Sequence, residues 1–325
     1  MRLPRAGLYC WFVLLLPSLA LCQTINGGSP QTHQLLLPKV TAHRDRTRDI
    51  DAIGIRNVGC SRGIGNWYTL QSQIALGKEY SHRIEATAKL ITDPEITDYI
   101  NEIGQNLVRN SDAQVPFTIK IIDSEDVNAV ALPGGFFYID SGLILAADSE
   151  AELAGVMAHE IAHVAACHAA RGRTRGQLMG LASLSMTMIG GPIAYAAYET
   201  MTVAKPFTLL RFSRKFESEA DFYGVQYMYR AGYDPQALPA FFERVRAMQK
   251  SKAGIVARAF ATHPQTADRI AKTQDEINSL LPAETEYKVD TSEFQEVKAL
   301  LNKRENRVQT PSPNRPTLRR MPTSD

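Results

Sequence analysis

Residues 149–170 read SEAELAGVMAHEIAHVAACHAA and contain the pentapeptide His159-Glu160-Ile161-Ala162-His163. Ala, Leu, Val and Met surround the pentapeptide, so the pattern predicts a helix that is buried in the protein. On a helix, residues four apart lie on one face with about 5 to 6 Å between Cβ atoms, so His159 and His163 can direct ring nitrogens at one metal ion. Glu160 lies beside this pair, where its carboxylate can reach a water molecule at the metal without binding the metal itself.

Alternative explanations of the pentapeptide are weak. Seven His and 34 acidic residues in 325 predict roughly 0.02 chance matches to His-acid-x-x-His, which disfavours a mere pair of core histidines. His168 lies about half a turn round a continuous helix from His159, so it makes a poor third ligand. The metzincin pattern is excluded because it needs Gly and His where this chain has Ala166 and Ala169. We expect Cys167 to be a small buried residue rather than a ligand.

A second helix is expected to supply the third ligand, because catalytic zinc takes three protein ligands and keeps one position open. Residues 213–232 read SRKFESEADFYGVQYMYRAG, a helical pattern that Gly232 closes. Glu217 and Asp221 are four apart and share one face, whereas Glu219 points elsewhere. One of the two carboxylates can bind the metal while the other accepts the second N–H of a ligand histidine. A solvated acidic face is the alternative, which the apolar residues of the same helix disfavour.

The neighbouring segments favour an α+β fold. Apolar residues at helical spacing predict helices at 70–90 and 94–110. Residues 115–123 alternate between apolar and polar side chains as a half-buried strand does. Residues 129–145 follow as two short strands that are broken at Pro133-Gly134-Gly135. We therefore expect a mostly helical domain with a small antiparallel sheet next to the helix that carries His159-Glu160-x-x-His163.

The start of the chain resembles a secretory signal peptide at residues 1–22. Arg2 and Arg5 precede an uncharged stretch that ends in small residues, as such signals do. Cleavage after Ala20 and cleavage after Cys22 both fit the small-x-small rule. Lipid attachment at Cys22 is the other outcome, and it would associate the protein with a membrane.

The remaining boundaries follow from composition. Residues 23–66 mix Gly, Pro, Thr, His and charges without a period, which predicts a mostly extended lead-in without core residues. The catalytic domain then spans 67–300, and 301–325 is a basic, disordered tail. Residues 176–198 are uncharged but interrupted by Gly and Pro. A buried or cleft-covering helical hairpin is favoured there over a membrane span.

Charge and cysteine usage exclude several classes of function. The 36 basic and 34 acidic residues leave a net charge of +2, too small for a typical nucleic-acid binder. Removal of residues 1–22 takes away two Arg (36 − 2 = 34), so the mature chain is formally neutral. No Cys-x-x-Cys pair indicates a thiolate metal site. Cys60 and Cys167 lie outside the signal, either as a disulfide or as two unpaired thiols.

These motifs resemble those of a known family, the HtpX-like and CAAX-prenyl-protease-like zinc metallopeptidases, most closely their periplasmic BepA and LoiP type. The resemblance spans about residues 67–300. It rests on four motifs, which are HEIAH at 159–163, ESEAD at 217–221, NAVALPGG at 128–135, and Thr262-His263-Pro264 followed by Arg269. It implies a gluzincin-like α+β domain in which Glu217, the acid four residues before Asp221, is the third ligand and Asp221 orients a ligand histidine.

The resemblance also implies how a substrate is held. The strand after Asn128 is expected to pair with an extended polypeptide through Ala129, Val130, Ala131 and Leu132. His263 is expected over the metal, where it either stabilises the oxyanion or caps zinc in a resting state. Several periplasmic relatives continue into helical repeats that hold partner proteins, and we expect no such partner domain after Leu300.

The sequence therefore predicts a zinc-dependent endopeptidase with one Zn²⁺ per chain. His159, His163 and Glu217 are the expected ligands, and Glu160 is the expected general base, assisted by His263. We expect export to a bacterial periplasm, with a lipidated Cys22 as the alternative to release, and unfolded or misassembled envelope proteins as substrates. No nucleic-acid partner is expected. The alternative hypothesis is a latent or non-catalytic, metal-bound holdase or assembly factor of the cell envelope.

Overall fold

Four strands form one sheet in the computed structural model of the protein, which describes residues 46–179, 213–251 and 263–309. The strands are β1 (Leu90–Ile91), β2 (Thr118–Ile122), β3 (Ala129–Leu132) and β4 (Phe136–Asp140). They lie in the order β1-β2-β4-β3, which places β3 at one edge. β1 pairs antiparallel with β2 and β3 with β4, whereas β2 and β4 are parallel. The sheet is therefore mixed rather than purely antiparallel.

The order of the hairpin strands explains this difference from the prediction. β3 and β4 form the expected hairpin, with Gly134 and Gly135 at φ +80° and +88° in its turn. After β2, the chain forms the edge strand β3 first and then returns as β4, which lies between β2 and β3. β4 runs antiparallel to β3 and parallel to β2. The predicted second strand extends too far, because α3 begins at Ser141. Local alternation cannot tell which strand of a hairpin lies inside.

Helices surround the sheet, and one further helix covers residues 168–179. The named helices, in chain order, are η1 (Arg46–Arg48), η2 (Ile50–Ala52), α1 (Leu70–Glu85), α2 (Pro94–Arg109), α3 (Ser141–Ala146), α4 (Glu150–Ala165), α6 (Arg214–Arg230), α7 (Ala237–Ser251), α8 (Ala267–Leu280) and α9 (Ser292–Gln309). The predicted mostly helical domain with a small sheet is thus confirmed.

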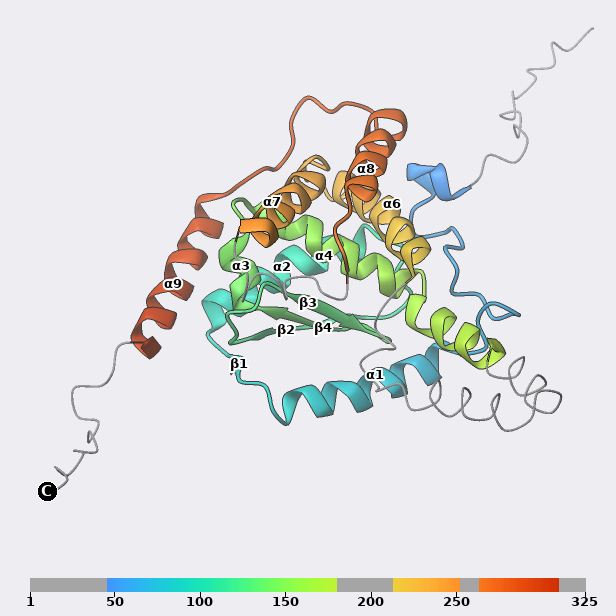
Figure 1. Ribbon diagram of the computed structural model, residues 1–325, viewed down its shortest axis with the longest axis horizontal. Helices are drawn as coiled ribbons and strands as arrows, with labels where there is room; N and C mark the ends of the chain where they lie inside the picture. The colour runs from blue at the N-terminus through green and yellow to red at the C-terminus, as the bar shows by residue number, and fades with distance from the viewer. Residues whose placement is uncertain (1–45, 180–212, 252–262, 310–325) are drawn as a thin grey trace, which may run out of the picture. The chain divides into compact units, whose positions relative to one another are not determined.

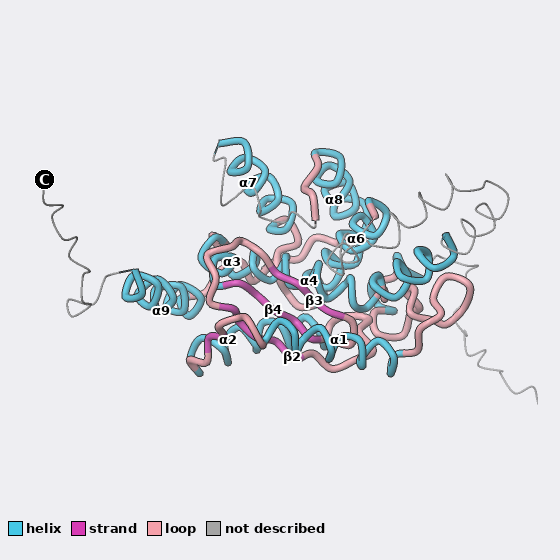
Figure 2. The backbone as a smooth tube through the Cα atoms, turned by 60° about the horizontal axis from the view of Figure 1, so that its bottom comes forward, coloured by secondary structure: helices cyan, strands magenta, loops and turns pink. Residues whose placement is uncertain are grey.

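The layers place α4 at the centre. α1 covers one face of the sheet, and α2 and α4 cover the other (Figures 1 and 2). Tyr138 of β4 shows the first contact, because its hydroxyl donates to Ser81 Oγ of α1 at 2.8 Å. α6, α7 and α8 form a further layer beyond α4 (Figure 1). Every residue of α4 is consequently buried.

Side-chain caps determine where the long helices begin. At the start of five helices, the side chain of the capping residue accepts a hydrogen bond from a backbone N–H of the first turn. These residues are Thr69 (α1), Asp93 (α2), Ser149 (α4), Ser213 (α6) and Thr266 (α8). Such caps stabilise a helix by about 1 kcal/mol each.

Residues 46–66 pack against the domain more closely than the sequence predicts. Val58 is buried in the main core, so the prediction that this lead-in has no core residues is wrong. Arg56 is buried as well, with Nε 2.8 Å from Asp112 Oδ2 and Nη1 2.7 Å from Gln226 Oε1. Its partners follow α2 and lie on α6, far away in the sequence, which is why composition alone could not reveal this attachment.

A disulfide between Cys60 and Cys167 also ties this segment to the domain. Of the two states that the sequence leaves open, the structure has the pair oxidised, and Cys167 is buried as expected. Cys167 lies in the turn that follows α4 and has a φ of +53°, a conformation that is uncommon for a residue other than glycine. The helix at residues 168–179 begins immediately afterwards.

The C-terminal boundary also differs from the prediction. α9 continues to Gln309, so the helix includes the first nine residues of the predicted disordered tail at 301–325. Leu301 is fully buried, and this apolar contact explains why the helix does not stop at residue 300. Residues 310–325 lie outside the described residues. The same is true of the predicted hairpin at 176–198 beyond residue 179.

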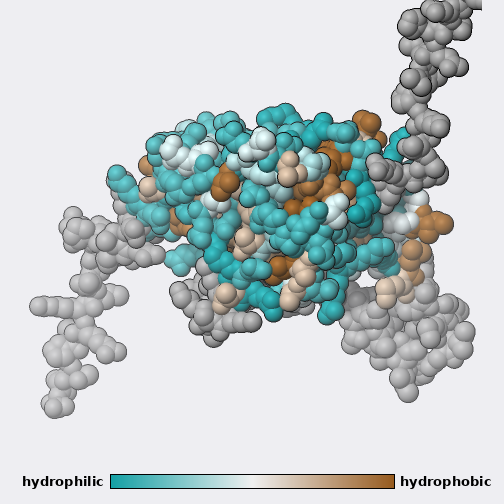
Figure 3. All heavy atoms as spheres, turned by 90° about the horizontal axis from the view of Figure 1, so that it is seen from above, coloured by the Kyte–Doolittle hydropathy of each residue, from teal (hydrophilic) through white to brown (hydrophobic). Residues whose placement is uncertain are grey.

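The face drawn in Figure 3 is mostly hydrophilic, with some apolar side chains among the hydrophilic ones. The large apolar residues that are exposed, among those described, are Ile55, Ile64, Trp67, Leu178, Met179 and Val289. Scattered residues of this kind are normal on soluble domains. None of the described helices combines the length and the apolar character needed to cross a membrane.

Gly77 tests the packing of α1 on the sheet. A Cβ at this position would lie 1.7 Å from the carbonyl oxygen of Pro133, in the turn between β3 and β4. Gly77→Ala should therefore lower the free energy of unfolding, measured by urea denaturation, by about 1 to 3 kcal/mol. Gly176→Ala is the control, because a Cβ there meets nothing within 4 Å, and it should stabilise its helix by up to about 1 kcal/mol. Equal effects would contradict this packing.

Candidate metal centre and active site

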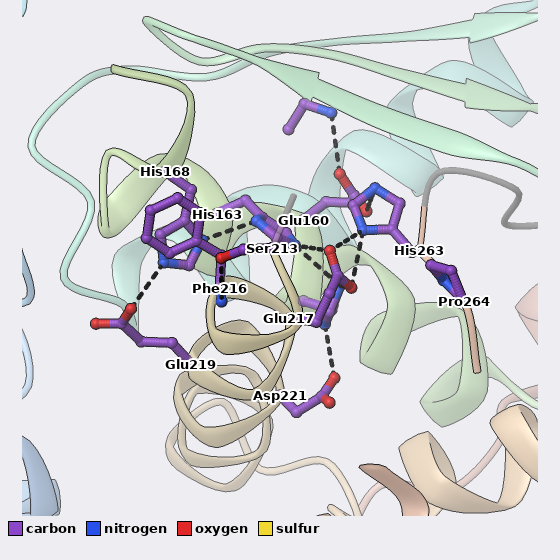
Figure 4. Close-up of polar contacts among 12 residues, drawn as sticks. Glu160, His163, His168, Ser213, Phe216, Glu217, Glu219, Asp221, His263 and Pro264 are labelled. Atoms are coloured by element: carbon purple, nitrogen blue, oxygen red, sulfur yellow. Dashed lines mark hydrogen bonds and ion pairs between the residues drawn. The ribbon is translucent and has the colours of Figure 1, made fainter. Parts of the chain in front are cut away.

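Four buried side chains from three segments converge in the core. His159 and His163 come from α4, Glu217 comes from α6, and His263 precedes α8; each offers a ligand atom, and these atoms lie within 4.8 Å of one another. The two Nε2 atoms of His159 and His163 are 3.1 Å apart. Glu217 Oε2 lies 3.5 Å from His159 Nε2, and its Oε1 lies 3.7 Å from His163 Nε2 (Figure 4). The structure thus brings the three predicted ligands together with His263.

Close packing of α4 against α6 brings these residues together. Ser213 caps α6 by accepting from the N–H of Phe216, which places Glu217 in the first turn of the helix. Further along α6, Gly224 lies against α4, where a Cβ would be 3.3 Å from the backbone N and Cα of His159. Because no side chain intervenes there, the two helix backbones can approach closely enough for Glu217 to reach both histidines.

A second group of charges surrounds His159 and Glu217. Asp221 Oδ1 lies 2.9 Å from His159 Nδ1, the ring nitrogen that faces away from the cluster. Arg269 of α8 donates to both oxygens of Asp221, from Nε at 2.8 Å and from Nη2 at 2.7 Å. Its Nη1 also lies 2.9 Å from Glu217 Oε2. These contacts of Arg269 are not predicted from the sequence, because its partners on α6 are about fifty residues away and periodicity carries no information over that distance.

These contacts hold charge inside the protein. Burial opposes the charge on His159, but hydrogen bonds to Asp221 and Glu217 outweigh it and raise its pKa to about 9. Burial likewise opposes ionisation of Asp221, but Arg269 and His159 lower its pKa below the ordinary value. The pKa of Glu217 is lowered in the same way, because hydrogen bonds from His159 and His263 outweigh burial. The carboxylates are therefore ionised and available as ligands at neutral pH.

Glu160 connects this cluster to the edge of the sheet. Its Oε2 accepts a hydrogen bond from the backbone N–H of Ala131 in β3 at 3.2 Å. Its Oε1 is buried, has no hydrogen-bond partner among the described residues, and lies 3.5 Å from His263 Nε2. The structure thus brings part of the predicted substrate strand, Asn128 to Leu132, next to Glu160. A water molecule or a substrate amide can satisfy the buried Oε1 atom.

The donor set fits a divalent transition-metal ion. Two imidazoles and one carboxylate, converging from rigid helices, are typical ligands of such ions. His263 adds a third imidazole, with Nδ1 3.0 Å from Glu217 Oε1. The unsatisfied oxygen of Glu160 lies beside this set, as an acid–base group next to a metal would. The residues present can therefore hold a metal ion beside a carboxylate that is able to accept a proton.

A contact on the far side of the His163 ring, away from the metal ligands, is not predicted from the sequence. α4 ends at Ala165, and the turn at residues 166–167 interrupts the helix, so His168 does not continue the same helix. His168 Nδ1 therefore lies 2.8 Å from His163 Nδ1. Glu219, which the periodicity of α6 directs away from the metal ligands, lies 3.3 Å from His168 Nε2. Helical periodicity could not reveal this arrangement because it assumes one continuous helix through residue 170.

Arg269 provides a test of this charge cluster. With chelator present, Arg269→Met should lower the free energy of unfolding by about 3 to 5 kcal/mol at pH 7.5, because two buried carboxylates lose their cation. The pKa values of Glu217 and Asp221 are lowered in the folded protein, so this stabilisation is present above about pH 4.5, the ordinary value for Glu, and is lost as the pH falls and both acids become protonated. The measurement is urea denaturation at pH 7.5 and at pH 4.

Arg244→Met is the matched control for this substitution. Arg244 pairs with Asp148 and Glu152, but its side chain is 21% exposed, so water can replace its contacts. We expect a smaller loss of stability than for Arg269→Met. A loss at Arg269 that is no larger than this control, or that does not change with pH, would contradict the role of Arg269 as the cation of the buried cluster.

Comparison with known proteins shows which family shares this arrangement of residues. The model of peptidase family M48 matches residues 94–277. Beta-barrel assembly-enhancing protease of Yersinia pestis is 31% identical over 279 residues, covering 83% of this chain and 54% of that protein. Putative beta-barrel assembly-enhancing protease of Vibrio cholerae is 33% identical over 240 residues, covering 71% and 49%. Mitochondrial metalloendopeptidase OMA1 of Schizosaccharomyces pombe is 31% identical over 202 residues, covering 61% and 56%.

These matches confirm the family resemblance that the motifs indicate. The chain spans about half the length of the beta-barrel assembly-enhancing proteases it matches, 54% and 49%. The matched family region runs from the start of α2 into α8 and so contains α4 and α6, the two helices that supply the cluster. On this agreement of sequence, fold and donor set, the chain belongs to peptidase family M48.

Proposed function

We propose that this protein is a zinc-dependent endopeptidase that cleaves unfolded or misassembled envelope proteins. One observation carries the proposal: the His159, His163 and Glu217 cluster lies directly beside Glu160, which in turn contacts the edge strand β3. A metal site, a proton acceptor and a place for an extended polypeptide are therefore adjacent. Membership of peptidase family M48 supports the same activity.

Zinc is the metal that these donors suit best, with one ion held by His159, His163 and Glu217. Bound there, it would polarise a peptide carbonyl and lower the pKa of a water molecule to about 7. Asp221 would fix the ring of His159, because its Oδ1 lies 2.9 Å from Nδ1 and a proton held there leaves Nε2 to bind the metal. Arg269 holds Asp221 and Glu217 in place and balances their charge.

Glu160 moves the protons of the reaction. Its carboxylate accepts a proton from the water that attacks the peptide carbonyl, and then returns that proton to the leaving amine. Its position between β3 and His263 supports this role, since a substrate lying along β3 would pass the carboxylate. The water attacks one carbonyl carbon, the C–N bond breaks, and an amine and a carboxylate are released.

The substrate would add to β3 as a further strand. In an antiparallel pair, alternate residues direct both backbone groups toward the partner strand and those between direct them outward. The N–H of Ala131 points away from β4, toward Glu160, so the backbone of Ala129 must point the same way. The backbone groups of these two residues other than the Ala131 N–H, which donates to Glu160, would bind a polypeptide with little regard to its side chains. Val130 and Leu132 would instead hold β3 to β4.

His263 has two roles that its position supports. As a donor near the metal it can stabilise the oxyanion that forms on the substrate. As a fourth ligand it can cap the metal and keep the enzyme at rest. Its ring lies 3.0 Å from Glu217 Oε1 and 3.5 Å from Glu160 Oε1, which is within reach of both functional acids. A His263→Ala enzyme that is slower than the wild type supports the first role, and a faster one supports the second.

Export to a bacterial periplasm is part of the proposal. The signal-like residues 1–22 motivate it, and the disulfide between Cys60 and Cys167 supports it, because such bonds persist in oxidising compartments. The names of the Yersinia and Vibrio relatives point to the assembly of beta-barrel proteins, which are envelope components. The mass of the mature protein would distinguish release from lipid attachment at Cys22.

Matched glutamine variants test the proposed roles of the two acids. Glu160→Gln should keep one Zn²⁺ per chain but lower kcat/KM for casein at least about 100-fold, because it removes the proton acceptor and leaves the ligands. Glu217→Gln should lose both zinc and cleavage, because a neutral amide replaces a charged ligand. Metal analysis and a casein-digestion assay measure the two properties.

The wild-type protein with and without chelator is the control. Chelator should abolish its digestion of casein, and binding of casein without any fragments would indicate a holdase instead. Turnover that persists in Glu160→Gln would remove this residue from the mechanism. A full zinc content in Glu217→Gln would reopen the choice of the third ligand.

A further inference from the structure

We propose that His168 and Glu219 are positioning residues for the metal ligand His163. They would hold its ring from behind, as Asp221 holds the ring of His159. The inference rests on the proposed function, because it assigns the two residues to the same metal centre. His168 and Glu219 are neither metal ligands nor the proposed proton acceptor, so they are additional residues of the centre.

The hydrogen bonds of this group allow a single arrangement of protons. If His163 gives the lone pair of Nε2 to the metal, its ring proton must sit on Nδ1. That N–H then donates to His168 Nδ1, which is 2.8 Å away, so the proton of His168 sits on Nε2. The Nε2–H in turn donates to Glu219 Oε2 at 3.3 Å. A carboxylate at the end of the series makes His163 a better electron donor to the metal.

The surroundings of His168 hold its ring in one orientation. The residue is fully buried, and its ring stacks on Phe216 with 4.5 Å between centroids and 16° between planes (Figure 4). Glu219 is held in turn by Arg171, whose Nη2 donates to its Oε2 at 3.1 Å. Arg171 also donates from Nη1 to the carbonyl oxygen of Ala166, in the turn after α4. His168 follows this turn directly, and Glu219 is attached to the same turn through Arg171.

The turn itself is also restrained. Cys167, directly before His168, has a φ of +53° and is bonded to Cys60. A non-glycine residue in this conformation costs free energy, and such residues cluster at functional sites. The turn ends α4 two residues after His163, and so allows His168 to face back toward the ligand. A continuous helix would place His168 elsewhere on its circumference.

The two ligand histidines are therefore held in different ways. His159 contacts its carboxylate, Asp221, directly at 2.9 Å, and Arg269 binds that carboxylate. His163 reaches Glu219 only through the ring of His168, and Arg171 binds that carboxylate. Each series runs from histidine through carboxylate to arginine. Loss of such outer partners typically costs 10- to 100-fold in metal affinity.

The test measures zinc affinity by competition with a chromophoric chelator, using the full chain. His168→Phe keeps an aromatic ring on Phe216 but removes both nitrogens, and should weaken Zn²⁺ binding about 10- to 100-fold. Glu219→Leu should weaken it in the same direction, whereas Glu219→Gln keeps an acceptor oxygen and should restore most of the affinity. With saturating Zn²⁺, kcat for casein should fall in His168→Phe while KM stays close to that of the wild type.

Tyr99→Phe is the matched control for loss of stability alone. The hydroxyl of Tyr99 donates to Glu150 at the other end of α4, so its removal should destabilise the same helix without changing zinc affinity. Wild-type zinc affinity in both His168→Phe and Glu219→Leu would overturn the inference, and so would an equal loss in Tyr99→Phe. If His168→Phe does not fold, the Glu219→Leu and Glu219→Gln pair decides. A wild-type protein that binds no Zn²⁺ would overturn the proposed function, and this inference with it.

Discussion

Burial of α4 on every side is the constraint on which the rest of this structure depends. A helix in the centre of a protein must find a partner for each of its polar side chains, because an unpaired one costs several kcal/mol. Glu150 is satisfied by the hydroxyls of Tyr99, Tyr233 and Thr291. The histidines in the middle of the helix are satisfied by α6, whose carboxylates face them. One requirement thus explains both the packing of the domain and the location of its charges.

The same constraint gives the centre its chemical character. Charges that are buried in pairs and triads keep fixed positions. Here Asp221 and Glu219, which each contact a histidine, also pair with an arginine, Asp221 with Arg269 and Glu219 with Arg171. Little reorganisation is then needed when a cation or a substrate binds. The side of the site that faces β3 is different, because there Glu160 accepts from the backbone N–H of Ala131 and keeps one buried oxygen without a hydrogen-bond partner among the described residues. Ligand geometry is rigid on one side, and the proposed polypeptide substrate would lie along β3 on the other.

Much of the fold follows from local patterns. Periodicity and capping residues predict α1, α2, α4 and α6 within a few residues, and the glycine turn predicts the hairpin of β3 and β4. The failures share one physical cause, which is that they depend on contacts between distant segments. Burial of Leu301 extends α9 beyond the predicted boundary, and the attachment of Arg56 brings the lead-in into the domain. Neither contact can be predicted from the residues that neighbour it in the sequence.

The sequence by itself determined the kind of chemistry, because the spacing of His159 and His163 on a helix, with Glu160 between them, directs a metal site and a proton acceptor at one place. It also determined that Glu217 and Asp221 share a face of a second helix. Only the tertiary structure decided that Arg269 pairs with both acids and that the ring of His168 contacts the ring of His163. The reason is physical, because periodicity describes one helix at a time, whereas these contacts arise between a turn that interrupts a helix and residues of separate helices.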